Sequence, residues 1–180
     1  MDILKPIYKA YDTAKSKKWD MIYWAIDLHG TMVKSTYNSD EEEFYPMVKE
    51  CLKELSKSDK IKLILYTCSY EKHMEKLMDE LRNDGIIFDY LNENPECEDT
   101  EYGTYKKKPY FNVLLEDKAG FEPSDWYIIW GWIQADLERC EKNLVEVENK
   151  LEKCPKCGET EHTNVPQWNK KICKNCQEVY

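Results

Sequence analysis

The chain has no long hydrophobic run and a deficit of positive charge, and each absence excludes a class of protein. No apolar stretch approaches the roughly 20 residues that a membrane-spanning helix needs, so we expect no membrane partner. Residues 1–20 are rich in lysine and lack the apolar centre of a secretion signal, so we expect a cytoplasmic location. The 26 Lys and Arg face 35 Asp and Glu, and the formal net charge of −9 argues against a surface that binds nucleic acid or anionic lipid throughout.

The pattern of residues 1–123 predicts an α/β domain. Short apolar runs of strand length alternate with helical patterns, and such alternation implies a parallel sheet with crossover helices, in a doubly wound architecture. We expect helices within 1–20, over 44–55 behind a capping box at Ser39 and Glu42, and over about 74–84. Strands are expected at 21–26, 61–66, 88–91 and 110–115.

A long helix is expected over residues 124–152, starting from an N-cap at Ser124. Its apolar residues recur at spacings of three and four, like the a and d positions of a heptad repeat. We expect its first half to pack on the α/β domain and its second half to project. Packing back on the domain and self-association into a homo-oligomer both remain open. The residues of this seam are Trp130, Ile133, Leu137, Cys140, Leu144, Val147 and Leu151.

Two Cys-x-x-Cys pairs near the C-terminus predict a zinc site in residues 153–180. In a cytoplasmic protein the eight cysteines are expected to be reduced thiols or metal ligands. Two such turns can supply four thiolates to one tetrahedral Zn²⁺, and four protein ligands leave no open position, so the ion would be structural. The segment resembles a zinc ribbon, a module that binds nucleic acid or protein, and Trp168 with Lys170 and Lys171 gives a weak nucleic-acid signal. His162 is expected at the surface. The predicted ligands are Cys154, Cys157, Cys173 and Cys176.

Polar residues follow the predicted strands at the edge where an open α/β sheet places its chemistry. Asp27 follows the strand 21–26, and Gly30 three residues later permits a tight turn. Thr67 follows the strand 61–66, Lys108 precedes the strand 110–115, and Glu116 with Asp117 follows that strand. Phosphoryl transfer through an aspartyl-phosphate needs a carboxylate nucleophile, a metal, groups that offset phosphate charge, and a proton donor.

The segment Asp27-Leu28-His29-Gly30-Thr31 is one residue away from Asp-x-Asp-Gly-Thr, the nucleophile motif of the haloacid-dehalogenase (HAD) superfamily. With Thr67, Lys108 and the acidic pair in the family's order, residues 20–130 resemble small HAD hydrolases of bacteria and phages. The resemblance implies that Asp27 is the nucleophile and that Asp27, the His29 carbonyl, Glu116 and Asp117 bind Mg²⁺. His29 replaces the family's second aspartate, and its imidazole is expected to act as acid and base.

The resemblance implies a Mg²⁺-dependent phosphatase whose partner is a phosphorylated substrate. The intervals between the motifs leave no room for a large cap domain, so the site is expected to be open enough for a nucleotide or a nucleic-acid end. The alternative is a catalytically weak HAD-like binding or scaffold protein, whose long helix and zinc ribbon contact protein or nucleic acid.

Overall fold

The chain folds into two units, Met1–Leu144 and Val145–Tyr180. The computed structural model describes residues 2–35, 43–101, 103–149, 154–158, 162–165 and 170–179, and for 145–149, 162–165 and 170–172 only the course of the backbone. The capping box at Ser39 and Glu42 and the side chains of Val147, Leu151, His162, Trp168, Lys170 and Lys171 lie outside what it describes. Within the described part, no helix combines the length and the apolar character that crossing a membrane requires.

The first unit is built on a four-stranded sheet in which every strand is parallel to its neighbours. The strands are β1 (Ile22–Ile26), β2 (Ile61–Leu65), β3 (Tyr90–Leu91) and β4 (Val113–Leu115), in the order β3-β2-β1-β4. The chain runs outward from β1 to β3 and then returns to place β4 on the other side of β1. Ile26 lies opposite both Leu65 and Leu115, so the carboxyl ends of the three neighbouring strands lie level. The boundary between β1 and β4 is therefore the point where the strand order reverses.

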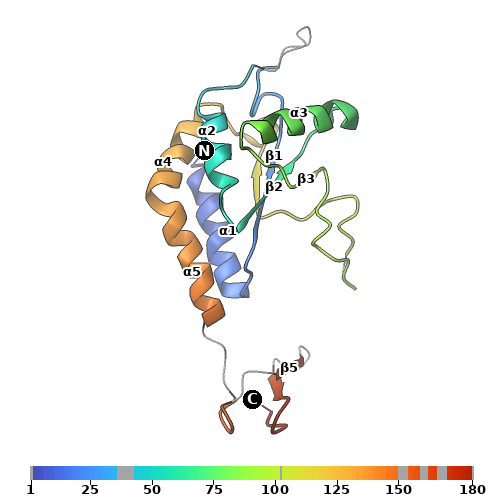
Figure 1. Cartoon of the computed structure of the whole chain (residues 1–180), viewed down its shortest axis with the longest axis vertical. Coiled ribbons are helices and arrows are strands. Elements are labelled where there is room, and N and C mark those ends of the chain that lie inside the picture. The colour runs from blue at the N-terminus through green and yellow to red at the C-terminus, as the bar shows by residue number, and fades with distance from the viewer. Residues whose placement is uncertain are drawn as a thin grey trace. The chain divides into compact units, whose positions relative to one another are not determined.

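Helices gather on one side of the sheet (Figure 1). Ile22, Trp24 and Ile26 of β1 are buried in a common core with residues of these helices. Trp132 joins the layers, because its ring lies 5.9 Å from that of Trp24 and 5.7 Å from that of Tyr11. The aliphatic and aromatic side chains between the layers form one large core, which accounts for why these amphipathic segments fold as helices. The helices are α1 (Leu4–Lys17), α2 (Val48–Leu55), α3 (Glu71–Asn83), α4 (Asp125–Trp132) and α5 (Glu138–Asn149), with a π-helical turn η2 (Ile133–Leu137) between the last two.

The opposite face of the sheet differs from the doubly wound arrangement that we expected. Around Tyr23 it is covered by the segment 92–112 and not by a helix. The Tyr23 hydroxyl donates a hydrogen bond to Glu96 at 2.7 Å, and the Asn112 side chain accepts one from the Tyr23 backbone N–H at 2.8 Å. Here Glu96 and Asn112 satisfy polar groups of Tyr23, and the Tyr110 ring packs 6.4 Å from the Tyr23 ring.

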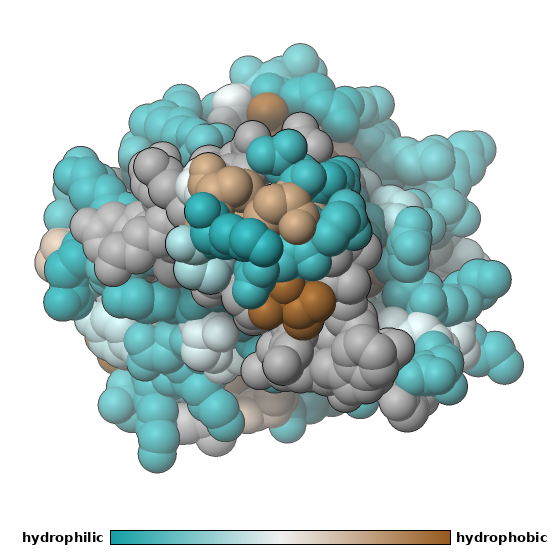
Figure 2. Space-filling view, turned by 90° about the horizontal axis from the view of Figure 1, so that it is seen from below, coloured by the Kyte–Doolittle hydropathy of each residue, from teal (hydrophilic) through white to brown (hydrophobic). Residues whose placement is uncertain are grey.

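The expected long helix exists through Asn149, but its second half does not project where its side chains are described. Cys140 and Leu144 of α5 are buried in the same core as α1 and α2, which corrects the expectation for residues 138–144. Up to Leu144, where its side chains are described, the seam is apolar because it faces the body of its own chain. Most of the described side chains that are visible in Figure 2 are hydrophilic.

Candidate functional site

Three carboxylates meet where the strand order reverses. Asp27 directly follows β1, and Glu116 and Asp117 directly follow β4. One ligand oxygen from each of the three lies within 4.8 Å of the others. Asp27 is buried and Glu116 is half-buried, while Asp117 lies nearer to solvent. Oxygen ligands gathered in this way can hold a hard divalent cation.

Thr31 and Gly30 connect the two halves of this acidic group. The Thr31 hydroxyl donates to Asp27 Oδ2 at 3.4 Å and accepts from the Asp117 backbone N–H at 3.1 Å. Gly30 has a φ of +85°, and a Cβ built there would lie 2.8 Å from Asp117 Oδ2. Position 30 therefore requires glycine for two reasons: its backbone conformation and the close approach of Asp117.

Trp126 of α4 holds the loop that contains Gly30 and Thr31 by a hydrogen bond. Its ring is fully buried, and its Nε1–H donates to the Thr31 carbonyl at 2.9 Å. The first half of the helix 124–152, which contains Trp126, was expected to pack on the α/β domain, and nothing in the sequence around Trp126 indicates the hydrogen bond. Thr31 was visible beside Gly30 as part of the motif, but its bridging role depends on where β4 lies.

Burial and the closeness of the three carboxylates shift their pKa values. Burial is the main cause that raises the pKa of Asp27; a hydrogen bond from the Leu28 backbone N–H lowers it, and the charge of Asp117 raises it. The pKa of Glu116 is also raised, first by burial and then by its hydrogen bond with Asp117, and that bond lowers the pKa of Asp117. A proton on Glu116 or a bound cation therefore offsets the concentrated negative charge.

The lysine beside the acidic group is Lys118, a residue that we did not select from the sequence. Its Nζ lies 3.2 Å from Asp117 Oδ1 and 3.7 Å from Glu116 Oε1, and its charge lowers the pKa of Asp27. Lys108 is exposed, and the ion pairs described for these carboxylates do not include it. The signal available in the sequence was the position of Lys118 directly after the acidic pair.

Thr67 and His29 lie at the same edge of the sheet. Thr67 is buried, its backbone N–H donates to Asn92 Oδ1 at 2.8 Å, and its hydroxyl lies 3.2 Å from that of Ser69. His29 is half-buried in the loop after β1, and its charge lowers the pKa of Asp27. The structure therefore gathers Asp27, Glu116 and Asp117 tightly, with His29 and Thr67 on adjoining loops.

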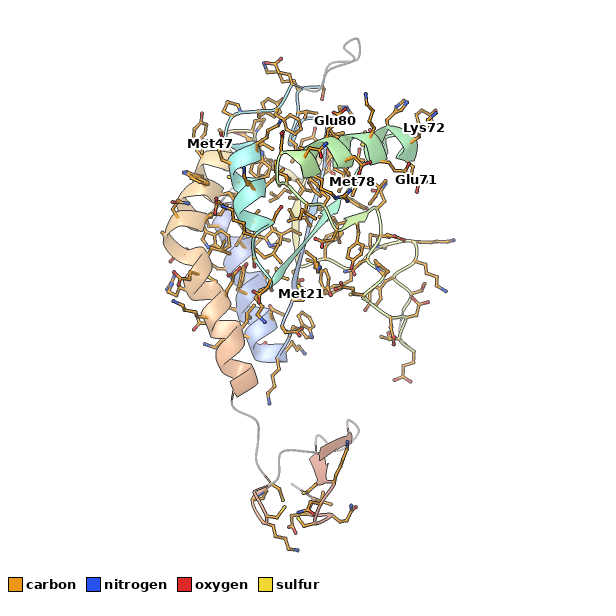
Figure 3. All side chains as sticks on the ribbon, in the orientation of Figure 1. Met21, Met47, Glu71, Lys72, Met78 and Glu80 are labelled. Carbon is orange, nitrogen blue, oxygen red and sulfur yellow. The ribbon has the colours of Figure 1, made fainter. Side chains whose placement is uncertain are left out.

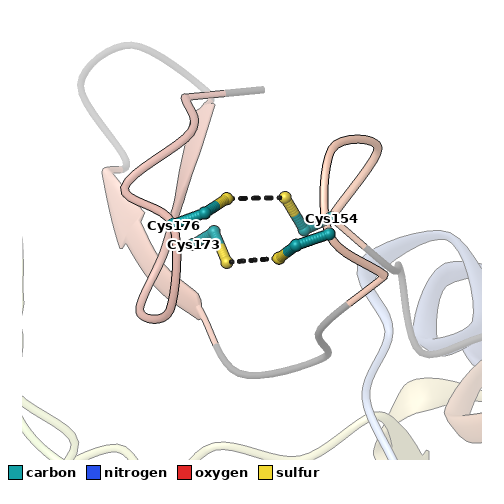
Figure 4. A group of neighbouring side chains, drawn as sticks. Cys154, Cys173 and Cys176 are labelled. Atoms are coloured by element: carbon teal, nitrogen blue, oxygen red, sulfur yellow. Dashed lines mark hydrogen bonds between the residues drawn. The ribbon is translucent and has the colours of Figure 1, made fainter.

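The four predicted zinc ligands meet in the second unit (Figure 4). Their sulfurs lie within 4.8 Å of one another, with 3.5 Å between Cys154 and Cys176 and 3.6 Å between Cys157 and Cys173. These distances exclude disulfides, whose sulfurs are about 2.05 Å apart. They are close to the spacing of about 3.8 Å that a tetrahedral ion with ~2.3 Å Zn–S bonds imposes, so the group can bind a metal.

Both cysteine turns have the same backbone geometry. The N–H of Gly158 donates to the Cys154 carbonyl at 2.9 Å, and that of Gln177 donates to the Cys173 carbonyl at 3.0 Å. Gly158 and Gln177 have positive φ angles of 74° and 58°. The second turn leads out of a hairpin of β5 (His162–Val165) and β6 (Lys170–Cys173). The two turns thus share one local geometry, and each supplies two of the four sulfurs that converge.

Comparison with known proteins bears on the fold alone. No family model matches the chain, and no curated protein matches it. A solved structure from Bacteroides thetaiotaomicron, described as that of a conserved protein coded by a locus, is 26% identical with a TM-score of 0.50. It matches 63% of this chain and 90% of its own length. The likeness supports a Rossmann-like α/β fold, and the neighbour's description names no activity.

Proposed function

We propose that the chain is a HAD-like, Mg²⁺-dependent phosphomonoesterase with a structural zinc ion in its second unit. The observation that carries the proposal is the convergence of Asp27, Glu116 and Asp117 at the β1–β4 boundary. Ligands bind at such a reversal point in open α/β sheets. A buried carboxylate at a strand end, beside two more carboxylates, fits a nucleophile next to its metal site better than it fits a stabilising role.

In the proposed reaction the Asp27 carboxylate attacks phosphorus while the bond from phosphorus to the leaving oxygen breaks. His29 donates a proton to that oxygen, and then takes one from the water that attacks the aspartyl-phosphate, which releases phosphate and restores Asp27. A Mg²⁺ held by Asp27, Glu116, Asp117 and the His29 carbonyl would neutralise phosphate oxygens. Thr67 contributes a hydroxyl, and Lys118 contributes the positive charge that the resemblance assigned to Lys108.

A phosphatase screen with Mg²⁺ tests the proposal, across nucleotides, sugar phosphates and end-phosphorylated oligonucleotides. We expect turnover that chelation abolishes and that Asp27→Asn, which is nearly isosteric, reduces at least 10³-fold, on the order of the loss when a nucleophile is removed. Asp79→Asn is the matched control, because Asp79 lies on the exposed side of α3 and pairs with Arg82 at 2.6 Å.

Substitution of His29 separates the enzyme from the alternative binding protein. If His29 is the acid, His29→Ala loses activity and His29→Asp retains it, because aspartate restores the family's motif. An inert parent with an active His29→Asp variant would favour the scaffold hypothesis. An active parent with a fully active Asp27→Asn variant would refute the assigned nucleophile.

A further inference from the structure

A cavity of about 270 Å³ lies at the end of the sheet opposite the acidic group. Trp19, Asp20 and Met21 on its wall come just before β1, whereas Asp27 comes just after it. Six residues of extended chain separate Met21 from Asp27, or about 20 Å at roughly 3.3 Å per residue. Figure 3 shows Met21 at one end of the strands and Glu71, which starts α3 after β2, at the other. The cavity is therefore a separate place from the proposed active site.

Aromatic rings at steep angles form the walls of this cavity. Tyr110 lies between three others: Trp19 at 5.8 Å and 83°, Tyr23 at 6.4 Å and 82°, and Tyr105 at 5.9 Å and 78°. All four of these aromatic residues line the cavity. Trp19 is 38% exposed, so the cavity is open to solvent on that side.

The charge of the cavity is negative. Asp20 and Glu98 supply carboxylates to the lining, and the described lining residues include no Lys, Arg or His. The nearby Lys106 lies 3.6 Å from Asp99, which is not part of the lining. Aromatic faces and carboxylates both attract cations, whereas an anionic phosphate would be repelled.

Hydrogen bonds hold the cavity's wall in shape although it belongs to a long loop. The buried Asn94 side chain donates to the Tyr110 carbonyl at 2.8 Å, and the Tyr105 N–H donates to Asp99 Oδ1 at 3.0 Å. Two hydrogen bonds attach the loop to β1: the Tyr23 N–H donates to the Asn112 side chain, and the Asn112 N–H donates to the Tyr23 carbonyl, both at 2.8 Å. Long ordered loops of this kind are usually functional.

We infer that this aromatic cavity binds an alkylated ammonium group. Its volume lies below the roughly 300–1,000 Å³ of pockets for drug-sized ligands, so it suits a trimethylammonium head and not a whole nucleotide. Neutral rings attract such a cation by their faces, and Asp20 and Glu98 add charge attraction. The group can belong to a free amine such as choline or to a methylated lysine side chain.

Titration at constant ionic strength tests the inference, with NMR shifts of the Trp19 indole as the readout. Choline and a trimethyl-lysine peptide are compared with 3,3-dimethylbutan-1-ol, which has the shape of choline without its charge. We expect saturable binding of at least one cation in the millimolar range and about tenfold weaker binding of the neutral alcohol. Whichever cation binds more tightly identifies the source of the group.

Three variants complete the test. Tyr105→Ala should weaken cation binding about fivefold or more by removing one ring, and Glu98→Gln about two- to threefold by removing one charge. Tyr127→Ala, at an exposed tyrosine of α4, is the matched control and should leave affinity unchanged. Because Glu98→Gln preserves size, it keeps the test decisive if Tyr105→Ala misfolds. Equal binding of the alcohol and choline, or no saturable shift by either cation, would overturn the inference.

Discussion

Gly30→Ala should damage the acidic group specifically, and Gly85→Ala provides its matched control. Both glycines have positive φ, +85° and +80°, so alanine costs about 1–2 kcal/mol of folding free energy at either position. Only at Gly30 does the new Cβ meet a carboxylate, 2.8 Å from Asp117 Oδ2; at Gly85 the nearest atom is Lys53 Cε at 3.4 Å, the end of a flexible side chain.

The difference between the two variants therefore isolates the displacement of Asp117. To bring the new Cβ and Asp117 Oδ2 from 2.8 Å to an ordinary contact distance of 3.4 Å, the carboxylate must move by roughly 0.6 Å. We expect Mg²⁺ affinity to fall about 10–100-fold, as it does when residues that orient metal ligands are substituted. Gly85→Ala should keep the parent's affinity. Both variants should melt roughly 3–8 °C lower, since about 1–2 kcal/mol acts on a unit of this size.

Calorimetric titration with Mg²⁺ and Mn²⁺, together with thermal melting, measures both quantities. Equal metal affinity in Gly30→Ala and Gly85→Ala would refute the argument from close approach. A parent chain that binds neither ion would refute the metal site itself.

Further predictions concern other parts of the chain. Thr31→Val should lower the free energy of unfolding by about 1–3 kcal/mol and weaken Mg²⁺ binding, because it removes a buried hydroxyl that is hydrogen-bonded to Asp27 and to the Asp117 N–H. Unchanged stability in denaturation together with unchanged Mg²⁺ affinity in titration would contradict this. Burial is the main cause that raises the pKa of Glu141, so folding favours the protonated side chain and the parent protein loses stability as the pH rises through the raised pKa. Glu141→Gln should therefore be more stable than the parent at pH 7 and as stable as the parent under acid conditions. Melting curves of the two proteins that coincide at every pH would oppose the assignment. Gln177→Gly should slow metal loss to a chelator, since glycine adopts a φ of 58° without strain, and faster loss would count against it. Chelation should unfold the second unit and leave the first folded, and metal analysis should find about one zinc per chain; a folded second unit without metal would disprove that structural role.

The sequence alone determined the features that depend on neighbours along the chain. Apolar periodicity predicted β1, β2, α1 and α3 within a few residues, because each buries one stripe or face whatever its partner. The Cys-x-x-Cys turns predicted that four sulfurs converge, since each turn orients its own pair through a local carbonyl hydrogen bond. The position of Asp27 at a strand end, followed by Gly30, likewise needed only local pattern.

Contacts between distant segments were decided by the tertiary structure. The Thr31 hydroxyl accepts a hydrogen bond from the Asp117 N–H, 86 residues away in the sequence, and the Thr31 carbonyl accepts one from the Trp126 indole, 95 residues away. No sequence periodicity encodes either bond. Lys118, in the turn after β4, accompanies the carboxylates. Lys108 lies in the loop before β4, and the charge pattern of the sequence did not distinguish the two lysines. The described part of the helix seam, through Leu144, faces its own domain. A repeat specifies an apolar stripe, and only packing specifies what covers it.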